Sequence, residues 1–278
     1  MLIQEEKYNY LEGIRLDDNG HYVFDKKYDF DSDIIKLTTD TSGKGTIDNI
    51  PYYYGYEFNV NAEAEDIKKF RSALKHEFTN PDIFYGVEAQ DFVDNGILHM
   101  DRYKHMNDFN VVISTASYYG EKTLTGLMCR YVWEYAKDDA EVADLQLIKE
   151  LAKNVTFDEI KADKALANTK KYKNPKKRER AIQDLKRQFE YAKKSGKIFK
   201  MKNYMPVLAR VGFSNFLKFA NKEQRDLYIA LDKGTEVLIC EDFITSGSTI
   251  KEIVRFLNSV NPNNKISVYV LINQKRNY

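Results

Sequence analysis

Two adjacent carboxylates near the C-terminus are the residues with the clearest potential for chemistry. Glu241 and Asp242 follow four apolar residues, 237–240, which are typical of a buried strand. In open α/β sheets, ligands bind outside the carboxyl ends of the strands. Two more apolar residues, Phe243 and Ile244, separate the acids from a polar loop. This spacing predicts two hydrogen-bond acceptors at a sheet edge where ligands bind.

The polar loop combines small hydroxyl side chains, one glycine and a run of backbone N–H groups. It consists of Thr245, Ser246, Gly247, Ser248 and Thr249. The loop leads into a predicted helix, whose N-terminal dipole and unpaired N–H groups favour a phosphate dianion. Carboxylates accept hydrogen bonds from hydroxyl groups, so the acids and the loop together suit a sugar phosphate. Alone, the acids would indicate a solvated loop start and the loop a helix cap, but their order and spacing favour a binding site.

The segment 237–249 resembles the signature with which type I phosphoribosyltransferases bind 5-phosphoribosyl-1-pyrophosphate (PRPP). The shared pattern is an apolar strand, two acids, two apolar residues and Thr-Ser-Gly-Ser-Thr. The resemblance implies that Glu241 and Asp242 are the catalytic pair, which accepts hydrogen bonds from the ribose 2- and 3-hydroxyls. It also implies that residues 245–249 surround the 5-phosphate. A looser resemblance covers roughly residues 105–275.

A second loop of small residues lies where this family binds the pyrophosphate of PRPP. The corresponding residues here are Ser114, Thr115, Ala116, Ser117 and Tyr118. They follow an apolar run at 109–113 and precede a helix that Thr123 is placed to cap. This match is less specific than the first, and a simple turn of small residues is the alternative.

The elements that must position both loops follow an alternating order. Apolar runs predict strands at 235–240 and 266–272, with an amphipathic helix from about 249 to 260 between them. Such a unit forms a right-handed parallel crossover. Another helix is predicted near 63–78, and turn signals with β-branched residues make residues 8–60 β-rich.

The predicted fold class is α/β, a type I phosphoribosyltransferase fold with a central, mostly parallel sheet flanked by helices. Residues 1–104 are expected to form a β-rich N-terminal hood, and residues 105–278 the core. A helical, basic insertion is expected within the core at about 137–204.

The basic insertion has three interpretations. The family closes its active site with a mobile loop in this interval, and a basic element there would face the negative charges of PRPP. Lys200, Lys202 and Arg210 are the candidates for that role. Local basic clusters also contact nucleic acid. Most lysines on a helix, however, simply form a solvated face.

The composition argues against several other classes of protein. The chain has 43 basic and 42 acidic side chains, a balance that argues against a dedicated nucleic-acid or membrane binder. Its two cysteines, Cys129 and Cys240, do not suffice for a disulfide framework or a zinc ribbon. No run is long and apolar enough for a membrane span, and the start lacks the layout of a secretory signal. A cytoplasmic location is therefore expected.

The resemblance implies a phosphoribosyltransferase that transfers the 5-phosphoribosyl group of PRPP to a nitrogenous base and releases pyrophosphate. It implies Mg²⁺ as cofactor, carried by PRPP near Glu241 and Asp242 rather than held by direct protein ligands. The alternative is an inactive relative that senses PRPP or nucleotides, with nucleic acid bound by the insertion. The intact acidic pair favours catalysis.

The acceptor base is not identified by the sequence. Hypoxanthine-guanine members carry an aspartate at the position of Thr245, so the chain departs from the 6-oxopurine pattern. Few residues follow the strand that ends near Ile272, so the base-recognition hood is expected from the N-terminal residues, the insertion or another subunit of a homodimer. Tyr118, Tyr119 and Phe243 are candidates for base contact, although aromatic residues near a pocket more often serve packing.

Overall fold

The computed structural model describes residues 12–25, 27–38, 43–76, 84–85, 89–115, 124–136, 143–244 and 247–274. The chain divides into two compact units. Unit 1 comprises residues 1–146, 231–247 and 263–278, and unit 2 comprises residues 147–230 and 248–262. Each unit is described by itself below.

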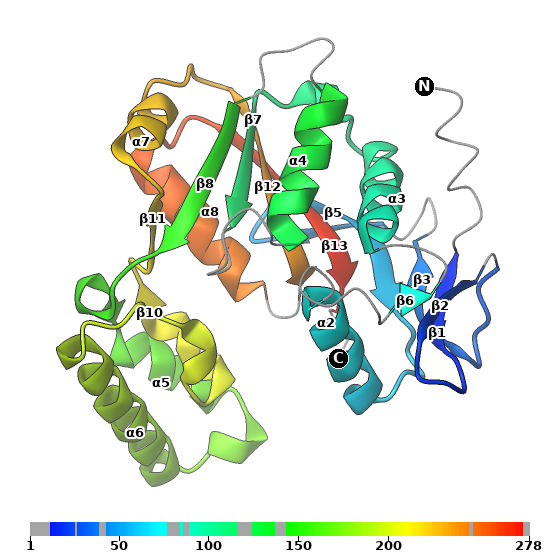
Figure 1. Cartoon of the computed structure of the whole chain (residues 1–278). Coiled ribbons are helices and arrows are strands. Elements are labelled where there is room, and N and C mark those ends of the chain that lie inside the picture. The colour runs from blue at the N-terminus through cyan, green and yellow to red at the C-terminus, as the bar shows by residue number, and fades with distance from the viewer. Residues whose placement is uncertain are drawn as a thin grey trace. The chain divides into compact units, whose positions relative to one another are not determined.

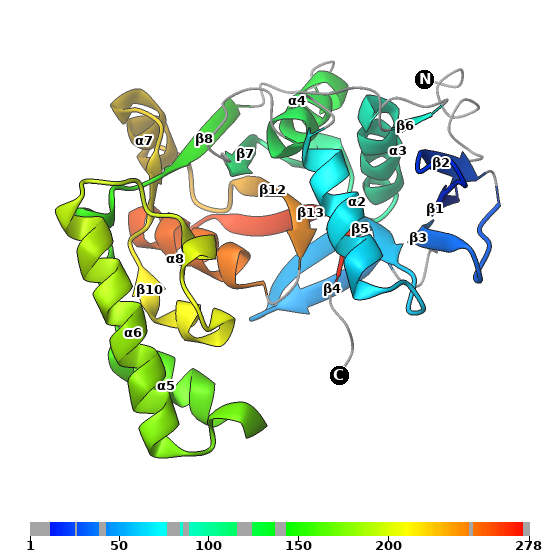
Figure 2. The same cartoon turned by 60° about the horizontal axis from the view of Figure 1, so that its bottom comes forward.

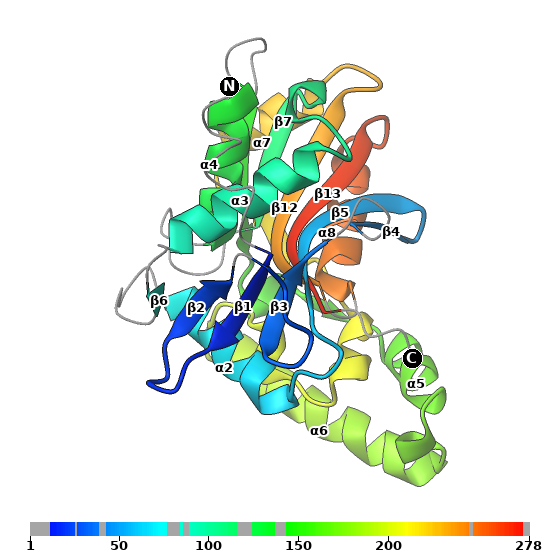
Figure 3. The ribbon, with the colours of Figure 1, turned by 90° about the vertical axis from the view of Figure 1, so that its right-hand side faces the viewer.

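Four parallel strands form the centre of unit 1. In sheet order they are β7 (Val111–Thr115), β12 (Glu236–Ile244), β13 (Lys265–Asn273) and β5 (Ile50–Phe58). Figure 3 shows them side by side in that order. Residues 237–240 of β12 are fully buried, as expected of a parallel strand covered on both faces. The predicted central parallel sheet is therefore confirmed.

The N-terminal strands extend this sheet beyond β5. They are β3 (Asp33–Leu37), β1 (Gly13–Leu16), β2 (Tyr22–Asp25) and β6 (Phe84–Tyr85) in sheet order, with β4 (Lys44–Ile47) paired to β5. Apart from the parallel β2–β6 pair, these strands pair antiparallel. The predicted β-rich region thus contributes β5 directly to the central sheet. Its role as a hood stays a prediction.

Helices of unit 1 pack on the sheet through apolar faces. They are α2 (Ala64–His76), α3 (Ala89–Asp101) and α4 (Leu124–Ala136), with a 3₁₀ turn at Met106–Asp108. The predicted helix at 63–78 is confirmed as α2, whose residues Ile67, Phe70 and Leu74 are buried. Helix α3 packs against β5 and β13, and α4 against β7 and β12 (Figure 1).

Unit 2 contains short strands and mostly polar helices. Residues 147–149 of β8 (Ala143–Lys149) pair antiparallel with β11 (Leu217–Phe219), and β9 (Thr156–Phe157) pairs with β10 (Phe213–Ser214). The helices are α5 (Glu159–Ala167), α6 (Pro175–Lys194), α7 (Lys222–Ile229) and α8 (Ser248–Val260). Short 3₁₀ turns lie at Ala152–Asn154, Lys170–Tyr172, Met201–Asn203 and Val207–Gly212. Figure 2 shows α5 and α6 packed side by side.

The interval predicted as a helical insertion includes a strand. Residues 143–149 form β8, in which Leu145 and Leu147 are buried while their neighbours are more exposed. This alternation with a period of two is typical of a strand, so the helical prediction was wrong there. Farther along, residues 159–167 and 175–194 are helical, in agreement with the pattern of the sequence. None of the helices in the described part of the chain is long and apolar enough to span a membrane.

Helix α3 approaches β5 closely at two glycines. A Cβ atom placed on Gly55 would lie 2.8 Å from both the Cα atom and the carbonyl oxygen of Gly96. A Cβ atom on Gly96 would meet the side chains of Leu271 and Tyr56, also at 2.8 Å. Backbone atoms cannot move aside as side-chain atoms can, so Gly55 should tolerate an added methyl group less well than Gly96.

We therefore expect Gly55→Ala to destabilise the protein more than Gly96→Ala. Overpacking against backbone at Gly55 should lower the free energy of unfolding by about 1–3 kcal/mol. At Gly96, the gain of about 1 kcal/mol in helix propensity should offset part of the cost. Urea denaturation of both variants measures the difference. Equal losses would show that α3 and β5 do not approach each other as closely as described.

Candidate active site

The acidic pair lies inside β12 rather than after it. The strand continues to Ile244, with Glu241 opposite Val270 of β13 and Phe243 opposite Ile272. The prediction that the strand ends at Cys240 was wrong, because Phe243 and Ile244 are themselves buried strand residues. Glu241 and Asp242 are half-buried, unlike the four residues before them.

The acids directly follow the last described pair between β12 and β7. That pair is Cys240 opposite Ser114, whereas pairing with β13 continues to Ile244. The Oδ1 atom of Asp242 accepts a hydrogen bond of 2.8 Å from the N–H of Phe243. The half-buried carboxylates thus lie toward the carboxyl end of the parallel sheet.

The predicted pyrophosphate loop starts beside the acidic pair. Ser114 is a buried residue of β7, and Thr115 is the last residue of that strand. Both belong to the strand rather than to a loop. Ala116, Ser117 and Tyr118, together with Tyr119, lie outside the described residues. Because β7 and β12 are parallel and Ser114 lies opposite Cys240, β7 ends at the same end of the sheet as Glu241.

Gly247 has a backbone conformation that favours glycine. Its φ angle is +70°, in the left-handed region, and a Cβ atom there would lie 2.8 Å from Cδ1 of Ile47. Helix α8 starts at Ser248, which is half-buried, and Thr249 is exposed. Thr245 and Ser246 lie outside the described residues. The predicted order of strand, short loop and helix is therefore confirmed, with three residues between the two elements.

Arg71 of α2 also reaches this region, which sequence reasoning missed. Its guanidinium carbon lies 4.7 Å from the centroid of the Phe243 ring. Its Nη1 atom donates a hydrogen bond of 2.8 Å to Oε1 of Gln274, just after β13. No carboxylate in the described part of the chain forms an ion pair with it. The sequence contained one indication that Arg71 faces the core: it is four residues after the buried Ile67, on the apolar side of the helix.

Two of the other predicted candidates have structural roles. Phe243 is 6% exposed, and its ring stacks against Phe58 with centroids 6.5 Å apart, so it serves packing rather than base contact. Arg210 donates a hydrogen bond of 2.7 Å from Nε to the carbonyl of Tyr204, and burial lowers the pKa of its guanidinium. Lys200 is half-buried in unit 2. That Lys200, Lys202 or Arg210 closes the active site stays a prediction.

The two cysteines meet in the core of unit 1. Cys129 of α4 and Cys240 of β12 are both free and buried, and their thiols interact through a hydrogen bond. Burial and the neighbouring thiol raise the pKa of Cys129 well above its usual value. A thiol with a raised pKa is a poor nucleophile at neutral pH. Within the described ranges, no three His, Cys, Asp or Glu side chains gather so as to hold a metal ion.

Comparisons with known proteins identify the class of domain. The family model "Phosphoribosyl transferase domain" matches residues 145–278. This segment contains β12, the acidic pair, Gly247, α8 and β13. Residues 145–278 therefore carry a phosphoribosyl transferase domain, and the resemblance seen at 237–249 is confirmed. The match starts after the predicted pyrophosphate loop, so it does not test that loop.

Two solved structures show weak similarity. They are crystal structures of a hypoxanthine phosphoribosyltransferase from Staphylococcus aureus, in an orthorhombic and a tetragonal space group. Each is 12% identical and covers 68% of this chain and 69% of that chain, with TM-scores of 0.30 and 0.29. Similarity this low identifies neither a substrate nor equivalent residues. No curated protein matches the chain.

Proposed function

We propose that the protein is a phosphoribosyltransferase that binds PRPP with Mg²⁺ and transfers its 5-phosphoribosyl group to a nitrogenous base. One observation carries the proposal. In the segment that matches the phosphoribosyl transferase domain, the half-buried acids Glu241 and Asp242 lie toward the carboxyl end of β12, and Gly247 and the first residue of α8 follow them within six residues of the chain. Carboxylates at this place can accept hydrogen bonds from ribose hydroxyls, and a glycine turn that leads into a helix N-terminus can hold the 5-phosphate.

In this proposal each segment binds one part of PRPP. Glu241 and Asp242 accept hydrogen bonds from the ribose 2- and 3-hydroxyls. The backbone N–H groups and hydroxyls of residues 245–249 hold the 5-phosphate. Residues 114–118 hold the pyrophosphate, since Ser114 lies opposite Cys240, the neighbour of the acids.

The residues present fit a magnesium ion that arrives with PRPP. Mg²⁺ usually keeps several waters and binds through one or two carboxylates together with substrate phosphates. Glu241 and Asp242 are half-buried acids toward the carboxyl end of the parallel sheet, which suits such a hydrated ion. When bound, Mg²⁺ neutralises charge on the departing pyrophosphate.

The chain's own residues would act mainly by position and charge. A ring nitrogen of the base forms a bond to C1 of the ribose as the bond from C1 to the pyrophosphate oxygen breaks, and pyrophosphate leaves with the electron pair. Positive charge that develops on the ribose is stabilised by Glu241 and Asp242. No nucleophilic side chain is required, because holding the two reactants in the correct geometry supplies most of the rate.

Neutralising the acidic pair should abolish turnover while the protein stays folded. We expect Glu241→Gln together with Asp242→Asn to lower pyrophosphate release from PRPP at least 100-fold across a panel of purine and pyrimidine bases. Chelation of Mg²⁺ should have a similar effect. Glu223→Gln on α7 is the matched control, because it removes one acid from a helix outside the segment 237–249. Full activity of the double variant, or PRPP binding by the wild type without turnover of any base, would contradict the proposed transfer.

A bulky residue at Gly247 should prevent PRPP from binding. Gly247→Val places a β-branched residue at a left-handed backbone position and brings its Cβ atom against the side chain of Ile47. Gly234→Val is the matched control, because Gly234 has a φ angle of +87° but no atom within 4 Å of its Cβ position. Isothermal titration should show loss of PRPP affinity for the first variant and little change for the second. Equal PRPP affinity of both variants would argue against the phosphate loop.

Arg71 should strengthen PRPP binding through its charge. Its guanidinium lies over Phe243, the residue between Asp242 and the strand end, without an ion-pair partner among the described residues. Arg71→Met keeps much of the packing but removes the charge, so we expect a several-fold higher KM for PRPP with kcat nearly unchanged. Arg71→Lys should restore most of the affinity. If the methionine and lysine variants behave alike, the role of Arg71 is packing only.

A further inference from the structure

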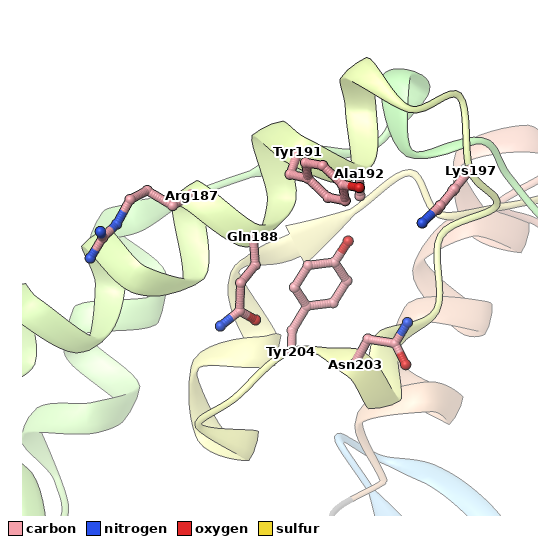
Figure 4. Close-up of a pocket in the computed structure, with 7 residues that line it drawn as sticks. All are labelled: Arg187, Gln188, Tyr191, Ala192, Lys197, Asn203 and Tyr204. Atoms are coloured by element: carbon pink, nitrogen blue, oxygen red, sulfur yellow. The ribbon is translucent and has the colours of Figure 1, made fainter.

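Unit 2 contains a pocket that the proposed transfer does not use. Its volume is about 490 Å³, and its lining comes from α6 and the segment that follows it. The lining residues are Arg187, Gln188, Tyr191, Ala192, Lys197, Asn203 and Tyr204. Figure 4 shows the ammonium group of Lys197 and the hydroxyl of Tyr204 directed toward the space between them. A volume in this range accommodates a small planar ligand.

The floor of the pocket is formed by closely packed aromatic rings. Tyr204 is only 4% exposed, and its ring stacks on Phe199 with centroids 5.0 Å apart and an interplanar angle of 15°. Phe189 and Phe213 pack against both rings, with centroids 4.8–6.1 Å apart. Burial raises the pKa of Tyr204, so its hydroxyl stays protonated and can donate a hydrogen bond. A preformed floor lowers the entropic cost of binding.

The rim of the pocket offers an aromatic ring to solvent. Tyr191 is a large hydrophobic residue that is 67% exposed. The Nζ atom of Lys197 lies 5.4 Å from the centroid of its ring. Lys197 is exposed and forms no ion pair with any described carboxylate. An exposed aromatic ring can stack on a planar group of a ligand, and the neighbouring ammonium group can pair with a negative charge on the same ligand.

Positive charge continues from the pocket along α6. Residues 175–202 contain 11 Lys and Arg but only 3 Asp and Glu. Arg180, Arg187 and Lys194 follow one another at intervals of seven residues, about two helical turns or 10.5 Å of rise, and so share the face of α6 that carries Tyr191. Arg187 pairs with Asp184, whereas Arg180 and Lys194 pair with no described carboxylate. The face therefore combines a track of cations with one aromatic pocket.

We propose that this face of unit 2 binds single-stranded nucleic acid. One base enters the pocket and stacks on Tyr191, while the phosphates on either side contact Arg180, Arg187, Lys194 and Lys197. The amides of Gln188 and Asn203 and the hydroxyl of Tyr204 supply donors and acceptors for the edge of the base. Proteins that bind single strands combine a basic surface that follows the backbone with aromatic side chains on which bases stack.

The pocket favours a single strand over a duplex or a free phosphate. In a duplex the faces of the bases are stacked on each other and are not available to Tyr191. A free phosphate would use Lys197 but not the aromatic ring or the amides. The proposal does not depend on phosphoribosyl transfer, because no lining residue belongs to the segments 114–118 or 241–249.

Fluorescence anisotropy of the full chain with labelled 12-nucleotide U and dT strands, without PRPP, tests the proposal. We expect binding at 50 mM salt that weakens markedly at 200 mM salt, because neutralising phosphates releases counterions. Tyr191→Ser should weaken binding about 5- to 150-fold, the effect of losing one stacked base. The double variant Arg180→Gln with Lys194→Gln should make affinity less dependent on salt. The slope of log affinity against log salt concentration should become shallower by about 0.7 for each phosphate that the variant no longer neutralises.

Lys222→Gln on α7 is the matched control, since it removes an exposed cation outside α6. It should leave the affinity for both strands unchanged. Circular dichroism should show that Tyr191→Ser folds, as its ring is mostly exposed. The proposal is overturned if neither strand binds at 50 mM salt, if Tyr191→Ser binds as well as the wild type, or if a duplex of the same length competes equally. Binding of U or dT strands that depends on Tyr191 supports it.

Discussion

The pairing of β12 with its two parallel neighbours decides where the candidate active site can form. Pairing with β13 persists to Ile244, which holds the strand in place, and the described register with β7 reaches Cys240, just before the acids. Glu241 and Asp242 therefore have a backbone fixed within the sheet and half-buried side chains toward its carboxyl end. Rigid placement on a strand is what a site needs when it acts through position and charge rather than through a nucleophile.

The two units hold their functional candidates in different ways. In unit 1, buried strands and close glycine contacts fix the backbone of the sheet that carries the acidic pair. In unit 2, a cluster of aromatic rings supports a surface rich in cations, some of which are neutralised locally, as Arg178 is by Asp163 at 2.9 Å. The proposed nucleic-acid surface would use cations of α6 that have no such partner among the described residues, such as Arg180 and Lys194.

The sequence predicted the elements that depend on local patterns. The order of β12, loop, α8 and β13 followed from apolar runs and from residues 245–249, and α2 followed from its three- and four-residue spacing. Helix α3 was not predicted, because its Asn95 and Gly96 are poor helix formers and the helix depends on tertiary contacts. One of these contacts is the hydrogen bond of 2.7 Å that Nδ2 of Asn95 donates to the hydroxyl oxygen of Tyr56. Arg71 was missed for a related reason: its contacts with Phe243 and Gln274 join residues far apart in the chain.

The parallel pairing of β5 with β13 has a consequence for the order in which the chain assembles. Tyr52 lies opposite Val268, and Tyr56 opposite Ile272, so β5 must wait for a partner strand that is made 216 residues later (268 − 52). During synthesis the edge of β5 that β13 later covers has no native partner, and closing so long a loop slows folding. Until then, the tyrosine-rich β5 is a segment that a chaperone or another chain could pair with.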